Sequence, residues 1–268
     1  MSRSISASSE ARQETERDPA APSPPVPSAQ LAQALALHQA GQFSEAERLY
    51  RRILETHPKH FDCLHLLGLI HYQRGEHGEA VRQIDAALMS NSGVAAAYNS
   101  RGAALMELGR LDDAMASYEK AIAINPDCAE AFNNRGMALA RYGRSDEALA
   151  SYDRAISLKP DFIEAFNNRG FVHAELRRFD EALMSYDQAI ALKLNYPEAL
   201  SNRAAALNEL GRFEDAVASC DTATALKPDL AEAFYNRGNA LFALKQLDAA
   251  STSYDRALAL KPNHTEAF

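Results

Sequence analysis

The chain of 268 residues has no tryptophan, few aromatic side chains and only three cysteines. Cysteines as scattered as Cys63, Cys128 and Cys220 form no disulfide framework, which is typical of proteins from a reducing compartment. No apolar run approaches the roughly 18 residues of a membrane helix. No hydrophobic stretch follows the first arginine, as one would in a secretory signal. We therefore expect a cytoplasmic protein that has no membrane partner.

Basic residues are also in deficit, and the formal net charge is −8. Nucleic acids bind to basic faces through their phosphates, so we expect no nucleic-acid partner. Histidines gather around Cys63, but their spacing matches no standard zinc finger. The common phosphate-binding, serine-hydrolase and zinc-protease motifs are absent from the sequence. We expect no catalytic residue, no cofactor and no metal ligand in this chain, and therefore no enzyme.

What the sequence does contain is a segment that returns at a fixed interval. Ala129-Glu-Ala-Phe-Asn-Asn-Arg-Gly136 reappears 34 residues later as Ile163-Glu-Ala-Phe-Asn-Asn-Arg-Gly170, and weaker copies lie on both sides. A fixed period of this size indicates a solenoid of stacked units. With Gly136 at position 8, the seven units are 27–60, 61–94, 95–128, 129–162, 163–196, 197–230 and 231–264.

The two ends of the chain fall outside these units. Residues 1–26 are rich in serine, alanine and proline. Such a segment cannot bury enough apolar surface to offset the entropy lost on ordering, so we expect a disordered tail. Residues 265–268 repeat the start of a unit and are expected to begin an incomplete eighth one.

Within the 34-residue unit, several positions keep one kind of residue. Position 8 is usually glycine, position 15 is usually glycine, position 20 is always alanine, position 24 is usually aromatic and position 32 is usually proline. For position 8 the glycines are Gly68, Gly102, Gly136, Gly170 and Gly238; for position 15 they are Gly41, Gly75, Gly109, Gly143 and Gly211. These two positions take ten of the twelve glycines, which leaves almost none for a phosphate-binding loop.

Each of these positions has a physical role in a pair of antiparallel helices. Glycine at 8 and alanine at 20 allow the two helix axes to approach closely. Glycine at 15 ends the first helix in the left-handed conformation, and proline at 32 stops the second. Acidic residues at the start of each second helix suit the helix dipole. The pairs Asp127 with Glu130 and Asp161 with Glu164 predict an acidic capping box at the start of the next unit.

This pattern resembles that of the tetratricopeptide repeat family, from about residue 27 to the last residue. The resemblance implies an all-α, right-handed α-solenoid of seven helix pairs in which the first helices line a concave groove. It also implies a protein-interaction scaffold, because repeat arrays present long concave binding surfaces. We therefore expect a protein or peptide ligand in the groove.

A row of asparagines occupies position 6, inside the first helix of units 4 to 7. These residues are Asn134, Asn168, Asn202 and Asn236. Asparagine inside a helix is less favourable than alanine by roughly 0.5–0.7 kcal/mol. Its amide offers donors and an acceptor that complement a peptide bond. The row is predicted to bind the backbone of a partner, with Met137, Phe171 and Phe242 as an apolar wall. The alternative is that each asparagine bonds a neighbouring helix and only sets the repeat spacing.

A second row lies at position 7 and consists of arginines, while position 25 is acidic in most units. The arginines are Arg101, Arg135, Arg169, Arg203 and Arg237, and the acids are Asp85, Glu119, Asp153, Asp187, Asp221 and Asp255. Two oppositely charged series with one period predict ion pairs between helices that fix the stacking. Binding of an acidic ligand is the alternative.

The asparagine row, within repeats that read Asn-Asn-Arg-Gly and Leu-Lys-Pro-Asp, is similar to the superhelix that precedes the catalytic region in O-linked N-acetylglucosamine transferases and related bacterial proteins. That resemblance implies recognition of protein substrates by their backbones. The alternative function is therefore a substrate-recognition arm whose catalytic region lies outside this chain. A third hypothesis is end-to-end self-association through the last helix. There, some of Ala250, Tyr254, Ala257 and Leu258 are expected to be exposed.

Overall fold

The computed structural model describes residues 28–262. The predicted disordered tail, 1–26, and the predicted start of an eighth unit, 265–268, lie outside the described residues. Residues 28–262 form fourteen helices and no strand. The helices are α1 (Ser28–Gln39), α2 (Phe43–Thr56), α3 (Phe61–Gln73), α4 (His77–Ser90), α5 (Ala95–Glu107), α6 (Leu111–Ile124), α7 (Ala129–Arg141), α8 (Ser145–Leu158), α9 (Ile163–Glu175), α10 (Phe179–Leu192), α11 (Pro197–Glu209), α12 (Phe213–Leu226), α13 (Ala231–Ala243) and α14 (Leu247–Leu260).

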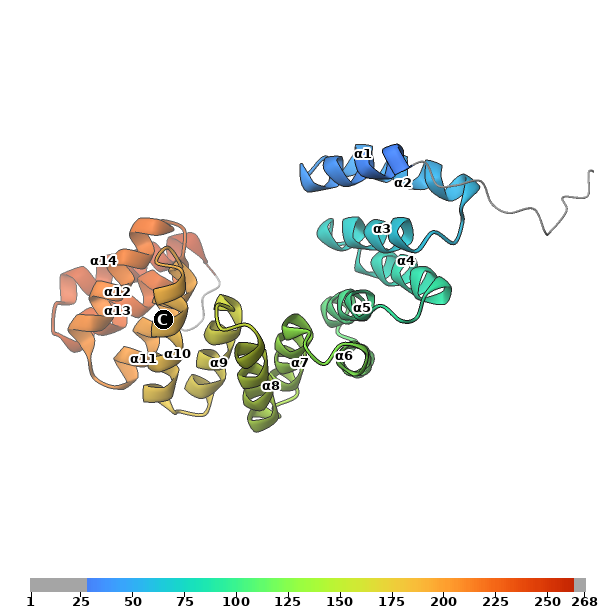
Figure 1. The fold of residues 1–268 in the computed structure, drawn as a ribbon. Coiled ribbons are helices and arrows are strands. Elements are labelled where there is room, and N and C mark those ends of the chain that lie inside the picture. Colours follow the sequence, from blue (N-terminus) through green and yellow to red (C-terminus); the bar gives the residue numbers. More distant parts are fainter. Residues whose placement is uncertain (1–27, 263–268) are drawn as a thin grey trace, which may run out of the picture.

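Consecutive helices pack as antiparallel pairs, and the pairs stack into a right-handed solenoid (Figure 1). Each first helix, such as α9, packs on its own second helix, α10, and on the second helix of the preceding unit, α8. Neighbouring first helices also contact each other, as α11 does α13, whereas neighbouring second helices contact each other far less. The stack therefore curves with its first helices on the inner side, as the sequence predicts.

The turn inside each pair uses a left-handed residue at position 15. Gly109 and Gly143 have φ of +70° and +72°, which confirms the predicted helix ends. Two units lack glycine at this position but keep the conformation, with Arg177 at φ +57° and Lys245 at φ +63°. A side chain in this region is strained, so these two turns are held by the packing around them.

The core of each pair joins position 8 to position 24. A Cβ atom added to Gly170 would lie 2.7 Å from the ring of Tyr186, and one added to Gly136 would lie 2.7 Å from that of Tyr152. Glycine is needed here because the tyrosine ring fills the space of a side chain. In unit 6 the pair is Ala204 with Cys220, so the larger residue at 8 accompanies a smaller one at 24.

The arginine row forms the predicted ion pairs between units. Each arginine binds the acid on the second helix of the preceding unit, at N–O distances of 2.6 Å for Arg101–Asp85, 2.8 Å for Arg169–Asp153, 2.6 Å for Arg203–Asp187 and 2.6 Å for Arg237–Asp221. Arg135 is the exception, because both of its bonds go to Ser151. The structural interpretation of this row is confirmed for four of the five arginines.

The same arginines also donate to a buried serine in their own unit. The N–O distances are 2.8 Å for Arg101–Ser117, 3.1 Å for Arg169–Ser185, 2.6 Å for Arg203–Ser219 and 2.8 Å for Arg237–Ser253. We call each set of arginine, acid and serine an arginine clamp, because it joins three successive helices. The bond to the serine was not predicted from the sequence, although serine occupies position 23 in five consecutive units.

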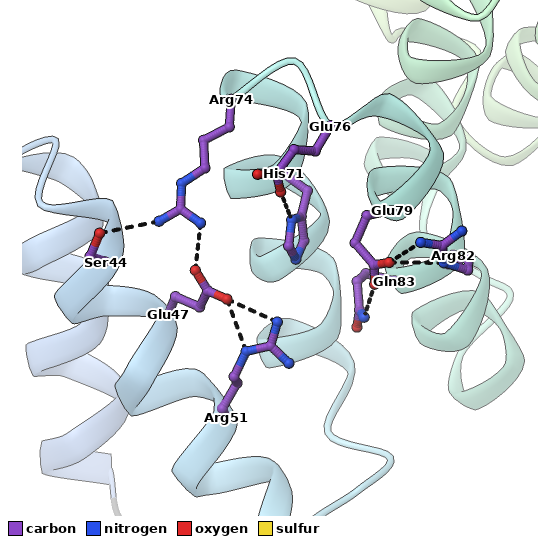
Figure 2. A network of polar contacts seen from close by, with 9 residues as sticks. All are labelled: Ser44, Glu47, Arg51, His71, Arg74, Glu76, Glu79, Arg82 and Gln83. Carbon is purple, nitrogen blue, oxygen red and sulfur yellow. Dashed lines mark hydrogen bonds and ion pairs between the residues drawn. The ribbon is translucent and has the colours of Figure 1, made fainter.

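Units 1 and 2 have no arginine at position 7, and a different network joins them (Figure 2). Arg74, just after α3, reaches back to Glu47 on α2 at 2.5 Å and to Ser44 at 3.4 Å. Glu47 also accepts a bond from Nε of Arg51 at 2.9 Å. Burial acts to raise the pKa of Glu47, but the two arginines lower it below its usual value. The carboxylate therefore stays charged and holds α3 against α2.

The predicted acidic capping box does not form. Helices α7 and α9 follow Cys128 and Phe162, and neither side chain bonds a free N–H of the helix. Asp127 lies one residue further out, in the turn, so the helix starts after it. The glutamate at position 2 instead pairs with the lysine at the end of its own unit, as Glu130 does with Lys159 at 3.4 Å.

The last helix, α14, exposes less apolar surface than its sequence predicts. Ala250 is 2% exposed and Ala257 is 0% exposed, because both face α13 in their own unit. Tyr254 and Leu258 are partly buried. Of the four residues expected to contribute to an open apolar end, the two alanines are therefore buried, whereas Leu247 of the same helix is 57% exposed.

Two of the three cysteines belong to the buried core of the described residues. Cys63 and Cys220 are fully buried, and burial raises the pKa of each thiol to about 12. Within residues 28–262 no group of three or more histidine, cysteine or acidic side chains could hold a metal ion. None of the helices over the same residues combines the length and apolarity that a membrane span requires.

Candidate functional site

The asparagine row lies on the inner first helices, one residue in each of α7, α9, α11 and α13. Each Nδ2 donates to the residue at position 5 of the preceding unit. The distances are 3.0 Å for Asn134 to Oδ1 of Asn99, 3.1 Å for Asn168 to Oδ1 of Asn133, 3.2 Å for Asn202 to Oδ1 of Asn167, and 3.1 Å for Asn236 to the carbonyl of Ser201. These contacts join neighbouring first helices, which is the structural role considered as the alternative.

Two members of the row, Asn134 and Asn168, belong to one continuous chain of hydrogen-bonded amides. Asn168 donates to Asn133, Asn133 donates to Oδ1 of Asn134 at 3.2 Å, and Asn134 donates to Asn99. Both the oxygen and one hydrogen of Asn134 are therefore engaged inside the protein. Because the side chain of Asn133 is 95% buried, this chain of amides is largely shielded from water.

The other three asparagines keep an unused acceptor. Among the described residues no donor bonds Oδ1 of Asn168, Asn202 or Asn236, and each of these side chains is half-buried. Asn168 and Asn202 each use one of their two amide hydrogens in the inter-unit bond and keep the other. Asn236 directs its Nδ2 to both the carbonyl and Oγ of Ser201, so its unused group is the oxygen. Binding of a partner's backbone by this row therefore stays a prediction. The asparagines with an unused oxygen lie on α9, α11 and α13.

A cavity of about 360 Å³ lies between units 4 and 5, at the edge of this row. Three of the predicted peptide-binding residues line it together, namely Met137, Asn168 and Phe171. The other lining residues are Ala140 and Arg141 of α7, Gly143 in the turn, Ser145 and Tyr152 of α8, and Val172 and Glu175 of α9. The sequence placed the first three on one surface but did not predict that α8 closes the cavity from below.

The apolar members of the cavity differ in exposure. Val172 and Tyr152 are each 2% exposed and form the floor, whereas Met137 is 37% and Phe171 is 52% exposed. Burial raises the pKa of Tyr152, so its hydroxyl stays protonated. Phe242, the third predicted wall residue, lies two units away on α13 and is 56% exposed. The predicted wall is therefore split into one site at α7–α9 and one on α13.

Two charged residues at position 13, Arg141 and Glu175, line the cavity, and Glu209 occupies the same position on α11, outside it. Arg141 donates from Nη1 to the carbonyl of Met106 on α5 at 3.3 Å. Glu209 pairs with Arg177 at 3.2 Å. Glu175 has no ion pair among the described residues, and it is exposed at the cavity mouth. The charged residues at position 13 recur with the 34-residue period, so the sequence contained this signal, and it was not predicted as part of the site.

Comparison with protein families gives one consistent result. Models of the tetratricopeptide repeat match residues 31–99, 129–162, 163–196 and 231–264, and a model described as a TPR repeat matches 102–143 and 204–245. Together these matches cover most of the fourteen helices. A comparison with curated proteins found no match.

Many solved structures share the fold. A tetratricopeptide repeat protein from Parabacteroides merdae is 18% identical, with a TM-score of 0.68 over 89% of this chain and 94% of that one. PilW, a type IV pilus biogenesis factor, is 24% identical, with a TM-score of 0.70 over 77% and 96%. YrrB, a TPR protein with an unusual peptide-binding site, is 24% identical, with a TM-score of 0.56 over 69% and 95%. At these identities the similarity concerns the fold alone.

Proposed function

The chain belongs to the tetratricopeptide repeat family, and we propose that it is a protein-interaction scaffold whose inner groove binds an extended segment of a partner protein. Asn168, Asn202 and Asn236 contact the backbone of that segment, and Asn134 supports the row from within. Met137, Phe171 and Phe242 contact its apolar side chains. The proposal gives the chain no catalytic step and no nucleic-acid partner.

The observation that carries this proposal is the row of unused amide oxygens on α9, α11 and α13. An extended backbone presents N–H and C=O groups in alternation, and an asparagine with one oxygen and one hydrogen left can serve both. Asparagine is unfavourable inside a helix, and the inter-unit bond needs only the amide hydrogen. The oxygens are therefore available to a ligand without any rearrangement of the stack.

A pair of matched double variants tests this role. Asn168→Ala with Asn202→Ala removes two groove amides and two inter-unit bonds. Asn133→Ala with Asn167→Ala removes the same two bonds from the acceptor side, together with the bond from Asn133 to Asn134, but leaves the groove amides in place. We expect the first variant to lose binding to an array of unrelated 12-residue peptides, and the second to keep most of it.

Circular dichroism and melting in the same buffer would verify that both variants are folded. Equal loss of peptide binding in the two variants would show that the row acts only through repeat spacing. Retention of full binding by Asn168→Ala with Asn202→Ala would also contradict the proposal, as would failure of the unmodified protein to bind any peptide.

A second candidate function uses the same groove, namely the substrate-recognition arm of an O-linked N-acetylglucosamine transferase-like enzyme. The row of unused amide oxygens favours it, because that function requires recognition of a protein backbone regardless of sequence. Nothing in the described residues supplies glycosyl transfer, so the catalytic part would have to lie in another segment. The mass of the native protein in its own cell extract tests this. A species near 29 kDa would favour the free scaffold, and a much larger one the arm.

A further inference from the structure

We infer that the cavity between α7 and α9 is an anchor pocket for one large apolar side chain of the bound segment, and that Glu175 selects a lysine or arginine next to that side chain. This inference rests on the proposed groove function and adds a ligand preference to it. It names the partner segment by its chemistry, an apolar residue flanked by a basic one.

The size and lining of the cavity suit a side chain better than a whole small molecule. Its volume of about 360 Å³ lies near the lower end of ligand pockets, which span about 300–1,000 Å³. The floor is apolar and buried, and Oδ1 of Asn168 lies at its edge without a donor. A segment could therefore place its side chain on Val172 and Tyr152 while its backbone N–H reaches Asn168.

The apolar residues at the mouth are only partly used in internal packing. Phe171 is 52% and Met137 is 37% exposed, and both occupy position 9. In units 6 and 7 the same position is Ala205 and Asn239. Large apolar side chains thus flank the cavity between units 4 and 5, while the following units are small or polar at this position. Such a localised apolar patch is typical of an interaction site.

The charge expected in the bound segment follows from the charged side chains at the cavity mouth. Two charged side chains line the cavity, Arg141 and Glu175, and neither forms an ion pair among the described residues. The guanidinium of Arg141 is held by its bond to the carbonyl of Met106 on α5, in the preceding unit. The exposed carboxylate of Glu175 has no such bond, so it is the charged group that can move to meet a ligand at the cavity mouth. The whole chain carries a net charge of −8, so the surrounding field also favours a cation. Charge complementarity of this kind selects partners and steers their approach.

An oriented peptide library would test both parts of the inference. Three pools of 11-residue peptides carry phenylalanine, leucine or aspartate at the centre, with all other positions degenerate except for cysteine. Each pool is passed over the immobilised full chain, and the retained peptides are sequenced. We expect the phenylalanine and leucine pools to be retained roughly tenfold more than the aspartate pool, with lysine and arginine enriched close to the centre.

Matched variants separate the two contributions. Phe171→Ala with Met137→Ala should abolish the preference for an apolar centre, whereas Met184→Ala, which trims an exposed methionine on α10, should not change it. Glu175→Arg should replace the basic enrichment by an acidic one. Glu107→Arg, at the same repeat position on α5 but outside the cavity, changes the net charge equally and should have no effect.

Each remaining outcome decides against one of the two ideas. Retention without preference for an apolar centre would overturn the anchor pocket, and basic enrichment that survives Glu175→Arg would overturn the role of Glu175. In both cases the groove itself would still bind peptides, so the proposed function would stand. Failure of every pool to bind the unmodified chain would overturn the proposed function and this inference together.

Discussion

Arg203 on α11 binds Asp187 on α10 at 2.6 Å and so joins two consecutive units of the solenoid. The second nitrogen of the same guanidinium donates to Ser219 on α12 at 2.6 Å. One side chain therefore connects three successive helices. A solenoid has no central core, and its stability depends on contacts between neighbouring units. The arginine clamp supplies such a contact in a form that repeats with the sequence.

Replacing Arg203 by leucine should therefore weaken the interface between units 5 and 6. The ion pair is partly exposed and contributes at most about 1 kcal/mol, and the buried hydroxyl of Ser219 loses a charged donor, which adds about 1 kcal/mol. We expect the free energy of unfolding in urea to fall by roughly 1–2 kcal/mol. Arg212→Leu is the control, because its pair with Asp215 lies within one helix turn. An equal loss in both variants would show that the clamp has no special role.

Gly170→Ala tests the close approach of paired helices. Alanine is the better helix former, by about 1 kcal/mol, but its Cβ would lie 2.7 Å from the ring of Tyr186. Overpacking of this kind lowers stability by about 1–3 kcal/mol, so we expect a net loss in urea unfolding.

Unit 6 supplies the control for that substitution, because it combines Ala204 with Cys220. Introducing Tyr186→Cys next to Gly170→Ala should therefore lower stability by less than the sum of the two single changes. The measurement is a double-mutant cycle by urea denaturation. Additive effects would show that positions 8 and 24 are not coupled.

The fold could be predicted from the sequence because each recurring position has one local role. Left-handed turns at Gly109 and Gly143, and close helix packing at Gly170, depend on neighbours a few residues away or within one unit. The predicted capping box was wrong because the start of a helix is shifted by one residue relative to Asp127. Such a shift depends on how the preceding turn packs, and a sequence pattern does not contain it.

The candidate site was predicted in part. Asn168 and Phe171 were assigned to one surface, and both line the cavity, while their contact with a peptide stays a prediction. The acceptor of Asn168 on the preceding unit, Asn133, was not predicted, because a contact across 35 positions depends on the rotation between neighbouring units. The floor of the cavity was not predicted for the same reason. Tyr152 belongs to a second helix, α8, whereas only the first helices were expected to line the groove.

Arg177→Gly should raise the stability of the turn between α9 and α10. Arg177 has φ +57°, a conformation that costs a residue with a side chain about 1–2 kcal/mol. The substitution also removes an exposed ion pair with Glu209, which contributes little. We expect a gain of about 1 kcal/mol in the free energy of unfolding. The neighbouring change Arg178→Gly, at φ −91°, should lower stability instead. A loss in both variants would contradict the strain argument.

The stability of the solenoid should also decrease in mild acid. Burial lowers the pKa of His65 and of His173 below the usual 6.5, so the unfolded chain binds protons more readily than the folded one. The stabilisation is complete above pH 6.5 and is lost as the pH falls below it. At position 11, where His173 lies, five other units have leucine. We therefore expect His173→Leu to be more stable and to show a smaller drop in unfolding free energy between pH 7.5 and 5.5, measured in urea. An unchanged drop in that variant would show that protonation of His173 is not linked to unfolding.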